Sequence, residues 1–592
     1  MRHFSLVLLS FSLATPARPQ DPPPNLVRRS TSTPGVEVLL DLAPQRLHLD
    51  IPEERGVGRV AGAAEEQIAP RRTELPSTRQ GFVSAAELGL VAKRFDDGLL
   101  AAVERAADVG AGEFPGISQT LTAWAARSTE VSGGDREAGY AILLAAQALG
   151  AKLVPATPTA EAAREATWKS FLADEARSKP LGFYTWSGAL ERIFRRDRLL
   201  QERCSASELE RVLSALRGDA ELRARYERWL ALAGQMTNGF AALDLARVLA
   251  GEAIPRDGAA ILPPSRSFEG DLVKRLYGAS PIPPGFELAQ ALVDGVRGGT
   301  LSLAPRASSG WYDHIAYSLE PLAAPERMPE AARLELSERY RAELVGLLKG
   351  LLALARETHV KQLEIPTVGS AMPRFQAIVR PELRVEPLPT HYLRRARAYE
   401  FLERVLVNAF GAEALAARRV LREGEVEGES IAEALAAQRR LFLGAALCAS
   451  EDLGLAPRAL DAELVDDPAA RAAFLEWSER RQSDPELGAD VRMMVPIFYD
   501  VERRRTKVWV VLGWTRKPLL VTFAVPPHVR LVGEAVASEE VDLEFRSSSY
   551  DLAYPVTAEV YVQRLLDRAE LRALCDREKT QQKILQALAS LR

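Results

Sequence analysis

The stretch of sequence that decides the fold lies between residues 310 and 411 and contains three blocks: GWYDHIAYSLEP (310–321), ARETHVKQLEIP (355–366) and VRPELRVEPLPTHYLRRARAYEFL (379–402). Apolar residues recur at three- and four-residue spacing on both sides of the prolines, as on the buried face of a helix. Proline ends a helix because it lacks the backbone N–H that the helix needs. The stretch therefore predicts one helix from Pro329 to about Leu363 and a second from His391 to about Phe410.

Three of the six histidines of the chain fall in this stretch, among several carboxylates. Imidazole and carboxylate groups bind zinc, iron and manganese, so one hypothesis is a metal site built from His314, His359 and His391, with Asp313 or Glu386. The alternative is that each histidine is a hydrogen-bonded residue of the core. Asp313 and Glu386 are also candidates for the carboxylate pair of a glycosidase, if their separation fits. These five residues are the candidate catalytic residues.

A cluster of arginines follows the expected start of the second helix, where Thr390 is placed to cap it. Cations in the first turns of a helix oppose its dipole, at a cost of roughly 0.3–1 kcal/mol each. One interpretation is that Glu382, Glu386 or other carboxylates pair with them. The other is an anionic ligand held by the helix N-terminus and the arginines. The candidate ligand-binding residues here are Thr390, Arg394, Arg395 and Arg397.

A second candidate ligand-binding region precedes a predicted helix at residues 188–201, where aromatic residues crowd a short loop. Aromatic rings beside arginines can stack on sugars or other ligands, which would give Tyr184 and Trp186 a binding role. More often, a cluster of loop aromatics packs two helical layers together. Both interpretations remain open from the sequence.

Composition indicates an ordinary globular protein of several units. The chain has 592 residues, 47% hydrophobic and 26% charged, with a net charge of −4, so it shows no basic excess of the kind that nucleic-acid binders carry. We expect no nucleic-acid partner. Helical periodicity predicts a first helical unit at 81–251 and a second at 286–457, joined by a linker rich in proline and glycine at 252–285.

The period changes near the C-terminus. Short runs rich in β-branched and aromatic residues, such as TKVWVVLGW and PLLVTFAVPP, predict a small antiparallel β-sheet at 490–546. A C-terminal helix is expected at 556–592. The predicted fold class is therefore mainly α, multi-helical, with a small antiparallel sheet near the C-terminus, α+β overall.

The N-terminus has the features of a secretory signal peptide at residues 1–17: a basic start, an apolar core and small residues before a cleavage site. Residues 18–80 are rich in Pro, Arg, Ser and Thr and are predicted to be largely disordered. No later apolar run has membrane-spanning length, so we expect a soluble, exported protein, periplasmic or extracellular. The three cysteines allow one disulfide at most.

Four blocks of the chain resemble uncharacterised exported proteins of GC-rich bacteria, planctomycetes among them: GFYTWS…IFRRDRLLQ (182–201), GWYDHIAY (310–317), RETHVKQL (356–363) and VEPLPTHYLRRARAY (385–399). The spaced KQ and VEPxP elements are also similar to those of a broader family of secreted prokaryotic proteins of unknown function. The resemblance implies export and brings no activity, cofactor or catalytic residue.

The sequence is compatible with three hypotheses about the function of the protein. The sequence has no P-loop, no paired-histidine zinc helix, no GxSxG and no CxxC. The leading hypothesis is therefore an exported binding or scaffold protein with a protein, carbohydrate or anionic small-molecule partner. The alternatives are a metal- or carboxylate-dependent hydrolase with its site in residues 311–391, and an anion-binding protein. No cofactor is assigned.

Overall fold

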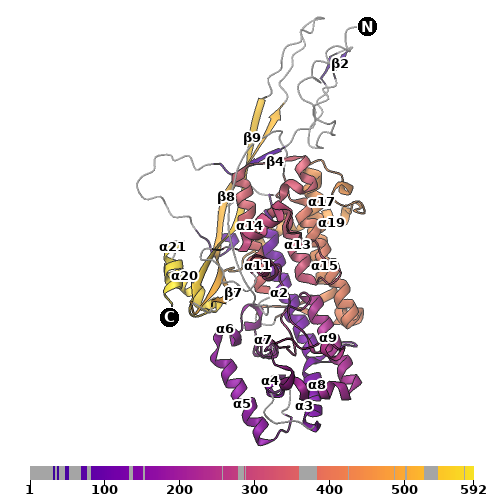
Figure 1. The fold of residues 1–592 in the computed structure, drawn as a ribbon. Helices are drawn as coiled ribbons and strands as arrows, with labels where there is room; N and C mark the ends of the chain where they lie inside the picture. Colours follow the sequence, from indigo (N-terminus) through magenta and orange to yellow (C-terminus); the bar gives the residue numbers. More distant parts are fainter. Residues whose placement is uncertain are drawn as a thin grey trace.

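The computed structural model describes residues 31–33, 36–38, 47–52, 68–75, 82–131, 138–150, 154–256, 258–277, 286, 288–358, 383–423, 426–485, 487–500, 503–525, 544–578 and 580–591. The described residues are mainly helical with a smaller β content, which confirms the predicted fold class. Helices stack into an elongated body, and a β-sheet lies along one side of it (Figure 1). Strands β8 and β9 extend past one end of the helices.

The central element is α2 (Ala85–Val109), which passes through the middle of the helical body (Figure 1). Its sequence is rich in Ala and Leu, and most of its side chains are buried, so it has no broad solvent-facing side. Ser84 and Glu87 form a capping box at its start, which satisfies backbone N–H groups that the helix leaves unpaired. The helix ends at Gly110, whose φ of 94° suits glycine.

Three buried carboxylates of α2 are paired with arginines from remote parts of the chain. Each of these carboxylate side chains is at most 3% exposed. The pairs are Glu87–Arg481 (3.4 Å), Asp96–Arg395 and Asp97–Arg568 (4.0 Å). Because an unpaired buried charge is costly, these contacts fix where the later segments sit on α2.

The helices of the first half form one group. They are α3 (Ile117–Glu130), α4 (Ala138–Gly150), α5 (Pro158–Ala173), α6 (Glu175–Ser178), α7 (Gly188–Leu200), α8 (Ala206–Gly218), α9 (Ala220–Met236) and α10 (Leu245–Leu249), with the 3₁₀ turns η1 (Arg72–Glu74) and η2 (Gly182–Thr185). In this group, α3 and α7 contact α2 directly.

The second half adds a further layer of helices. They are α11 (Phe268–Tyr277), α12 (Leu288–Gly298), α13 (Trp311–Ala323), α14 (Glu338–Thr358), α15 (Pro389–Phe410), α16 (Ala412–Ala417), α17 (Ile431–Asp452), α18 (Pro457–Leu460) and α19 (Pro468–Arg480), with the 3₁₀ turns η3 (Pro325–Arg327), η4 (Pro329–Ala332) and η5 (Arg481–Ser483). Buried side chains of both halves, such as Leu121 and Leu406, belong to one contiguous core.

The helix predicted to start at Pro329 starts later in the structure, at Glu338. Residues 329–332 form η4, and β4 (Leu334–Leu336) precedes α14. Leu334 and Leu336 pair with a strand from the N-terminal region, a partner that local periodicity does not reveal. The end predicted for the helix lies outside the described residues.

The predicted C-terminal sheet is present, with longer strands than expected. Its strands are β7 (Met493–Asp500), β8 (Arg505–Val525) and β9 (Glu544–Val562). The two runs predicted as separate strands are one strand, β8, which passes a bulge near Gly513. The C-terminal helix predicted from residue 556 is wrong for residues 556–562, which belong to β9. The helices that follow are α20 (Arg568–Glu578) and α21 (Gln581–Ser590).

Strand β3 (Leu47–Asp50) completes this sheet from far away in the sequence. The strand order is β4-β3-β8-β7, and β9 pairs with β8. β3 is parallel to β4 and antiparallel to β8. The prediction that residues 18–80 are largely disordered is therefore wrong for residues 31–33, 36–38, 47–52 and 68–75, and the rest of this range lies outside the described residues. Two smaller antiparallel pairs are β1 (Thr31–Thr33) with β2 (Val36–Val38), and β5 (Arg419–Arg422) with β6 (Val426–Ser430).

Cys204, Cys448 and Cys575 are buried free thiols. Among the described helices, none combines the length and the apolar composition needed to cross a bilayer.

Candidate functional site

The two described histidines of the predicted site contact different neighbours. His391 is buried, and its Nδ1 lies 2.6 Å from the Ser318 carbonyl oxygen. His314 stacks its ring on Phe401, with ring centroids 4.0 Å apart. Burial lowers the pKa of both histidines to about 4, so both are neutral near pH 7. His359 lies outside the described residues.

The two candidate carboxylates also have separate surroundings. Asp313 lies in the first turn of α13 and accepts a hydrogen bond from Ser309. Burial raises the pKa of Asp313, and the Ser309 hydroxyl opposes that shift. Glu386 contacts none of these groups and lies in the segment that leads into α15. The described contacts therefore do not bring the two carboxylates into one acid–base pair.

Glu386 is a buried junction between four parts of the chain. Its carboxylate accepts hydrogen bonds from the Tyr340 hydroxyl (2.7 Å), the Tyr554 hydroxyl (3.1 Å) and the Ala85 backbone N–H (2.9 Å). Burial raises the pKa of Glu386, and these donors oppose the shift. The contacts join α14, β9 and the start of α2, so Glu386 holds the sheet to the helices. The interpretation that Glu386 pairs with the arginines is wrong.

A carboxylate of this chain, that of Glu330, contacts the start of α15. Thr390 lies inside the helix and does not cap it, because the helix begins at Pro389. The Thr390 hydroxyl donates to the Glu330 carboxylate at 2.5 Å. Glu330 is 2% exposed, and burial raises its pKa to about 7, against hydrogen bonds from the side chain and backbone of Thr390. A carboxylate of this chain thus lies where the anion hypothesis places a ligand.

The three candidate arginines are all paired with carboxylates. Their partners are Glu320 for Arg394 (3.0 Å), Asp96 for Arg395, and Glu400 (2.8 Å) and Asp461 (3.3 Å) for Arg397. The predicted pairing with carboxylates is therefore present, although through different partners. The unpaired arginines that an anion site needs are not found here.

The aromatic loop packs inside the molecule. Phe183 and Tyr184 are buried, with ring centroids 4.1 Å apart, and the Tyr184 hydroxyl donates to Glu104 at 2.9 Å. Trp186 is half-buried and packs edge-on to Phe183. The loop joins α7 to α2, so the packing interpretation describes Tyr184 and Trp186 better than the stacking of a ligand.

The structure assembles a different polar site, which we name the α2–α15 centre: Lys93, Asp96 and Asp97 of α2 with His391, Arg395 and Tyr399 of α15. Asp96 accepts from Arg395 and from the Tyr399 hydroxyl (3.0 Å). Burial raises the pKa of Asp96, whereas Arg395 lowers it. All six side chains are buried.

A small cavity lies within the α2–α15 centre. It measures about 30 Å³ and is lined by Lys93, Asp96, Ser318, His391 and Arg395 together with apolar side chains. A buried water needs roughly 10–15 Å³, so the space suits one or two waters and no organic substrate. The Ser318 carbonyl can only accept, so His391 Nδ1 carries its proton and Nε2 is left as an acceptor. Arg395 Nε has no hydrogen-bond partner in the described part of the chain.

The sequence does contain a signal for the α2–α15 centre. Residues 92–99, AKRFDDGL, place four charges in the middle of a 25-residue helix that is rich in Ala and Leu and carries its four other charges nearer its ends. Where other elements cover such a helix on most sides, charges in its middle are buried and must be paired. Their partners on α15 are about three hundred residues later, so the sequence alone does not identify them.

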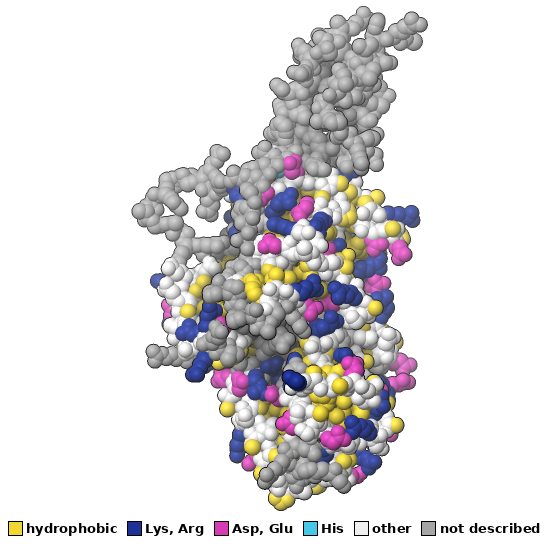
Figure 2. Space-filling view, viewed as in Figure 1, with side chains coloured by type: hydrophobic (Ala, Val, Ile, Leu, Met, Phe, Trp, Pro, Cys, Tyr) yellow, Lys and Arg dark blue, Asp and Glu magenta, His cyan; other side chains and the backbone are white. Residues whose placement is uncertain are grey.

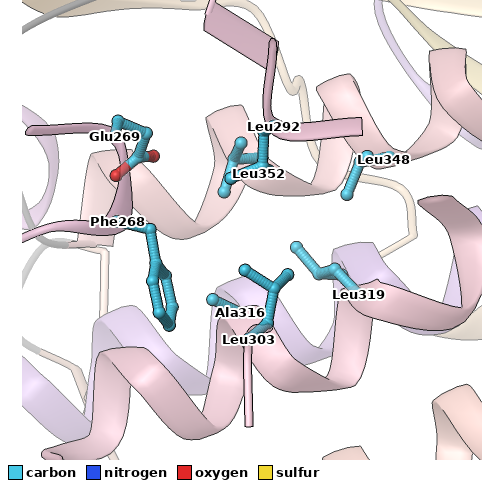
Figure 3. Close-up of a pocket in the computed structure, with 8 residues that line it drawn as sticks. All are labelled: Phe268, Glu269, Leu292, Leu303, Ala316, Leu319, Leu348 and Leu352. Carbon is cyan, nitrogen blue, oxygen red and sulfur yellow. The ribbon is translucent and has the colours of Figure 1, made fainter. Parts of the chain in front are cut away.

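A second cavity lies between α11, α12, α13 and α14 (Figure 3). It measures about 10 Å³ and is lined by leucines with Glu269 at its edge. Glu269 accepts from the Tyr312 hydroxyl and from Arg356 Nε, both at 2.8 Å. These contacts explain why the Glu269 pKa is lowered despite burial, which acts to raise it. The cavity is too small for a ligand larger than water.

Among the residues that the structure describes, no group of three or more His, Cys, Asp or Glu side chains is placed to hold a metal ion. Figure 2 shows acidic and basic side chains interspersed over the described surface on one face of the molecule, without a large area of one sign. No family model, curated protein or solved structure matches the chain.

Proposed function

We propose that the chain is a binding or scaffold protein, not a hydrolase with its site in residues 311–391. The supporting observation is that the described candidates there each bond to their own neighbours. His391 bonds to Ser318, Asp313 to Ser309, and Glu386 to Tyr340. A hydrolytic site would need these groups to converge on one open space. Their buried contacts instead join segments of the chain.

The test of this proposal is the metal content and hydrolytic activity of protein purified without a histidine tag. We expect elemental mass spectrometry to find no near-stoichiometric zinc, iron or manganese. We also expect glycoside and ester substrates to be hydrolysed no faster than in a buffer blank. His391→Gln and His314→Gln are the test variants, and the surface variant Glu400→Gln is the control. Stoichiometric metal that His391→Gln loses, or activity that Glu386→Gln abolishes in a folded protein, would overturn the proposal.

We also propose that the protein acts outside the cytoplasm. The support is the basic and apolar run of residues 1–17, which has the composition of a secretory signal peptide. Expression of the full chain followed by cell fractionation and N-terminal sequencing tests this proposal. A mature protein that begins near residue 18 in the exported fraction is expected. An intact N-terminus in the cytoplasmic fraction would contradict it.

A further inference from the structure

The cavity of the α2–α15 centre contains a hydrogen-bond donor and an acceptor that the described residues do not satisfy. Arg395 Nε carries a hydrogen atom and has no partner among these residues. His391 gives its Nδ1 hydrogen to the Ser318 carbonyl oxygen, and no described residue donates to its Nε2. Both side chains line the same cavity of about 30 Å³. The wall of the cavity therefore offers a ligand an N–H group and a lone pair.

The position of these two groups follows from α15. His391 and Arg395 are four residues apart on this helix, so their side chains lie on the same side of it. Each is held by another contact, His391 by the Ser318 carbonyl on α13 and Arg395 by Asp96 on α2. Only 2% of His391 and 6% of Arg395 is exposed, so both lie away from the surface. A buried N–H group or lone pair without a partner is costly, so a partner is needed within the cavity.

The lining of the cavity selects the charge and the size of a ligand. Arg395 and Lys93 disfavour a cation, whereas Asp96 and the lone pair of His391 Nε2 disfavour an anion. Burial also keeps His391 neutral near pH 7, because it lowers the pKa of this residue to about 4. The lining therefore suits a neutral molecule that both accepts and donates a hydrogen bond. The volume admits one or two molecules of the size of water, since each needs roughly 10–15 Å³.

We propose that this cavity binds a structural water that accepts a hydrogen bond from Arg395 Nε and donates one to His391 Nε2. The water completes a chain of hydrogen bonds that begins at the Ser318 carbonyl on α13, passes through α15 and ends at Asp96 on α2. A bridging water is enthalpically nearly as favourable as a direct hydrogen bond. The three helices are then joined through a ligand as well as by their packing. The inference goes beyond the proposed function and does not depend on it.

A crystal structure of the full chain, from crystals grown in sodium bromide, tests the identity of the ligand. We expect a water within about 2.7–3.2 Å of both Arg395 Nε and His391 Nε2, and no anomalous signal from bromide in the cavity. A bromide peak in the cavity would reveal an anion site and would overturn the proposal. A cavity without density, in a map that shows other buried waters, would also overturn it, as would a water that reaches only one of the two atoms.

A double-mutant cycle tests the bridge in solution at pH 7. His391→Asn keeps a side-chain N–H for Ser318 and has no atom at the Nε2 position, whereas Arg395→Lys keeps the charge for Asp96 and has no Nε–H. We expect His391→Asn to raise the unfolding equilibrium constant about fivefold more in the parent than in Arg395→Lys, because only the parent has a bridge to lose.

The control background for this cycle is Arg397→Lys, whose side chain is 43% exposed, and it should leave the effect of His391→Asn unchanged. Equal effects of His391→Asn in the parent, in Arg395→Lys and in Arg397→Lys would overturn the bridge. The crystal structure of the parent needs no variant, so it decides the question even if a variant does not fold.

Discussion

The Glu330 carboxylate accepts the Thr390 hydroxyl at 2.5 Å in the first turn of α15. Two residues sixty positions apart in the sequence thus form a hydrogen bond at the start of α15. In the sequence, this helix start is a candidate site for an anionic ligand. The helix N-terminus favours a negative charge there, whereas burial opposes it. Burial raises the pKa of Glu330 to about 7, against hydrogen bonds from Thr390 and from its own backbone that lower it, so its protonation is linked to folding near neutral pH.

The first prediction concerns Glu330→Gln and the pH dependence of stability. The folded-state pKa of about 7 exceeds the usual 4.5, so the folded protein binds more protons between these values. Stability from this group is complete below pH 4.5 and is lost as pH rises to 7, by on the order of 3 kcal/mol. Urea unfolding at pH 5 and 7.5 should show the variant gaining stability relative to the parent as pH rises. Glu400→Gln, on the surface, should show no such gain, and parallel profiles for Glu330→Gln would contradict the prediction.

The second prediction is that His391 makes the stability of the protein change with pH in the direction opposite to Glu330. Burial lowers its pKa to about 4, below the usual 6.5, so the unfolded chain binds the extra proton between these values. The stability from neutral His391 is present above pH 6.5 and is lost as pH falls to 4, by on the order of 3 kcal/mol. His391→Gln keeps a donor for the Ser318 carbonyl and should flatten this acid limb, measured as the unfolding midpoint between pH 7 and 4.5. An unchanged acid limb would refute the expectation.

Arg395 and Arg397 are two residues apart on α15 and should respond very differently to removal of their charge. Arg395→Met leaves Asp96 buried without its main partner and should destabilise the protein by about 3–5 kcal/mol. Arg397 has a 43% exposed side chain, so Arg397→Met should cost at most about 1 kcal/mol. Denaturant titration of both variants measures the difference. Restoring stability by combining Arg395→Met with Asp96→Leu would support the pairing, and equal losses for both arginines would argue against it.

Gly98 provides a steric prediction on α2. In an exposed helix, Gly→Ala stabilises by about 0.5–1 kcal/mol. Here a Cβ atom at residue 98 would lie 2.0 Å from the Leu421 carbonyl oxygen, a backbone atom that cannot turn aside. Gly98→Ala should therefore destabilise, by about 1–3 kcal/mol, as judged by thermal unfolding. Gly188→Ala in α7 has its nearest contact at 3.6 Å and should be tolerated, so a stable Gly98→Ala protein would disprove this packing.

Local patterns in the sequence were sufficient for the fold class and insufficient for the contacts between remote segments. The helical periodicity and the change of period near residue 490 predict the helices and the strands of the C-terminal sheet. The packing of Phe183 and Tyr184 also follows a general preference for buried aromatics. Local patterns do not predict strand β3, because its four residues form a strand only by pairing with residues 334–336 and 520–522.

The candidate site was harder to predict for the same physical reason. Histidine and carboxylate residues indicate that a catalytic or metal site is possible, but only the distances between their side chains show whether such a site forms. Glu386 is buried, and its partners are Tyr340 and Tyr554. The charges in the middle of α2 are visible in the sequence, whereas the arginines that pair with them depend on the whole fold.

Because carboxylates of α2 pair with arginines from later parts of the chain, these contacts form only after the later parts have been synthesised. The helix leaves the ribosome early, but Arg395, Arg481 and Arg568 are synthesised long after Asp96, Glu87 and Asp97. Until then, α2 has its contacts with α3 and α7 and the nearby cations Arg72 and Lys93, whereas Asp96 lacks its arginine and the contacts with α14 and α17 are missing. Contacts of such sequence separation are slow to form and leave hydrophobic surface open to aggregation. The side of α2 that α14 and α17 cover is therefore exposed until those helices have been made.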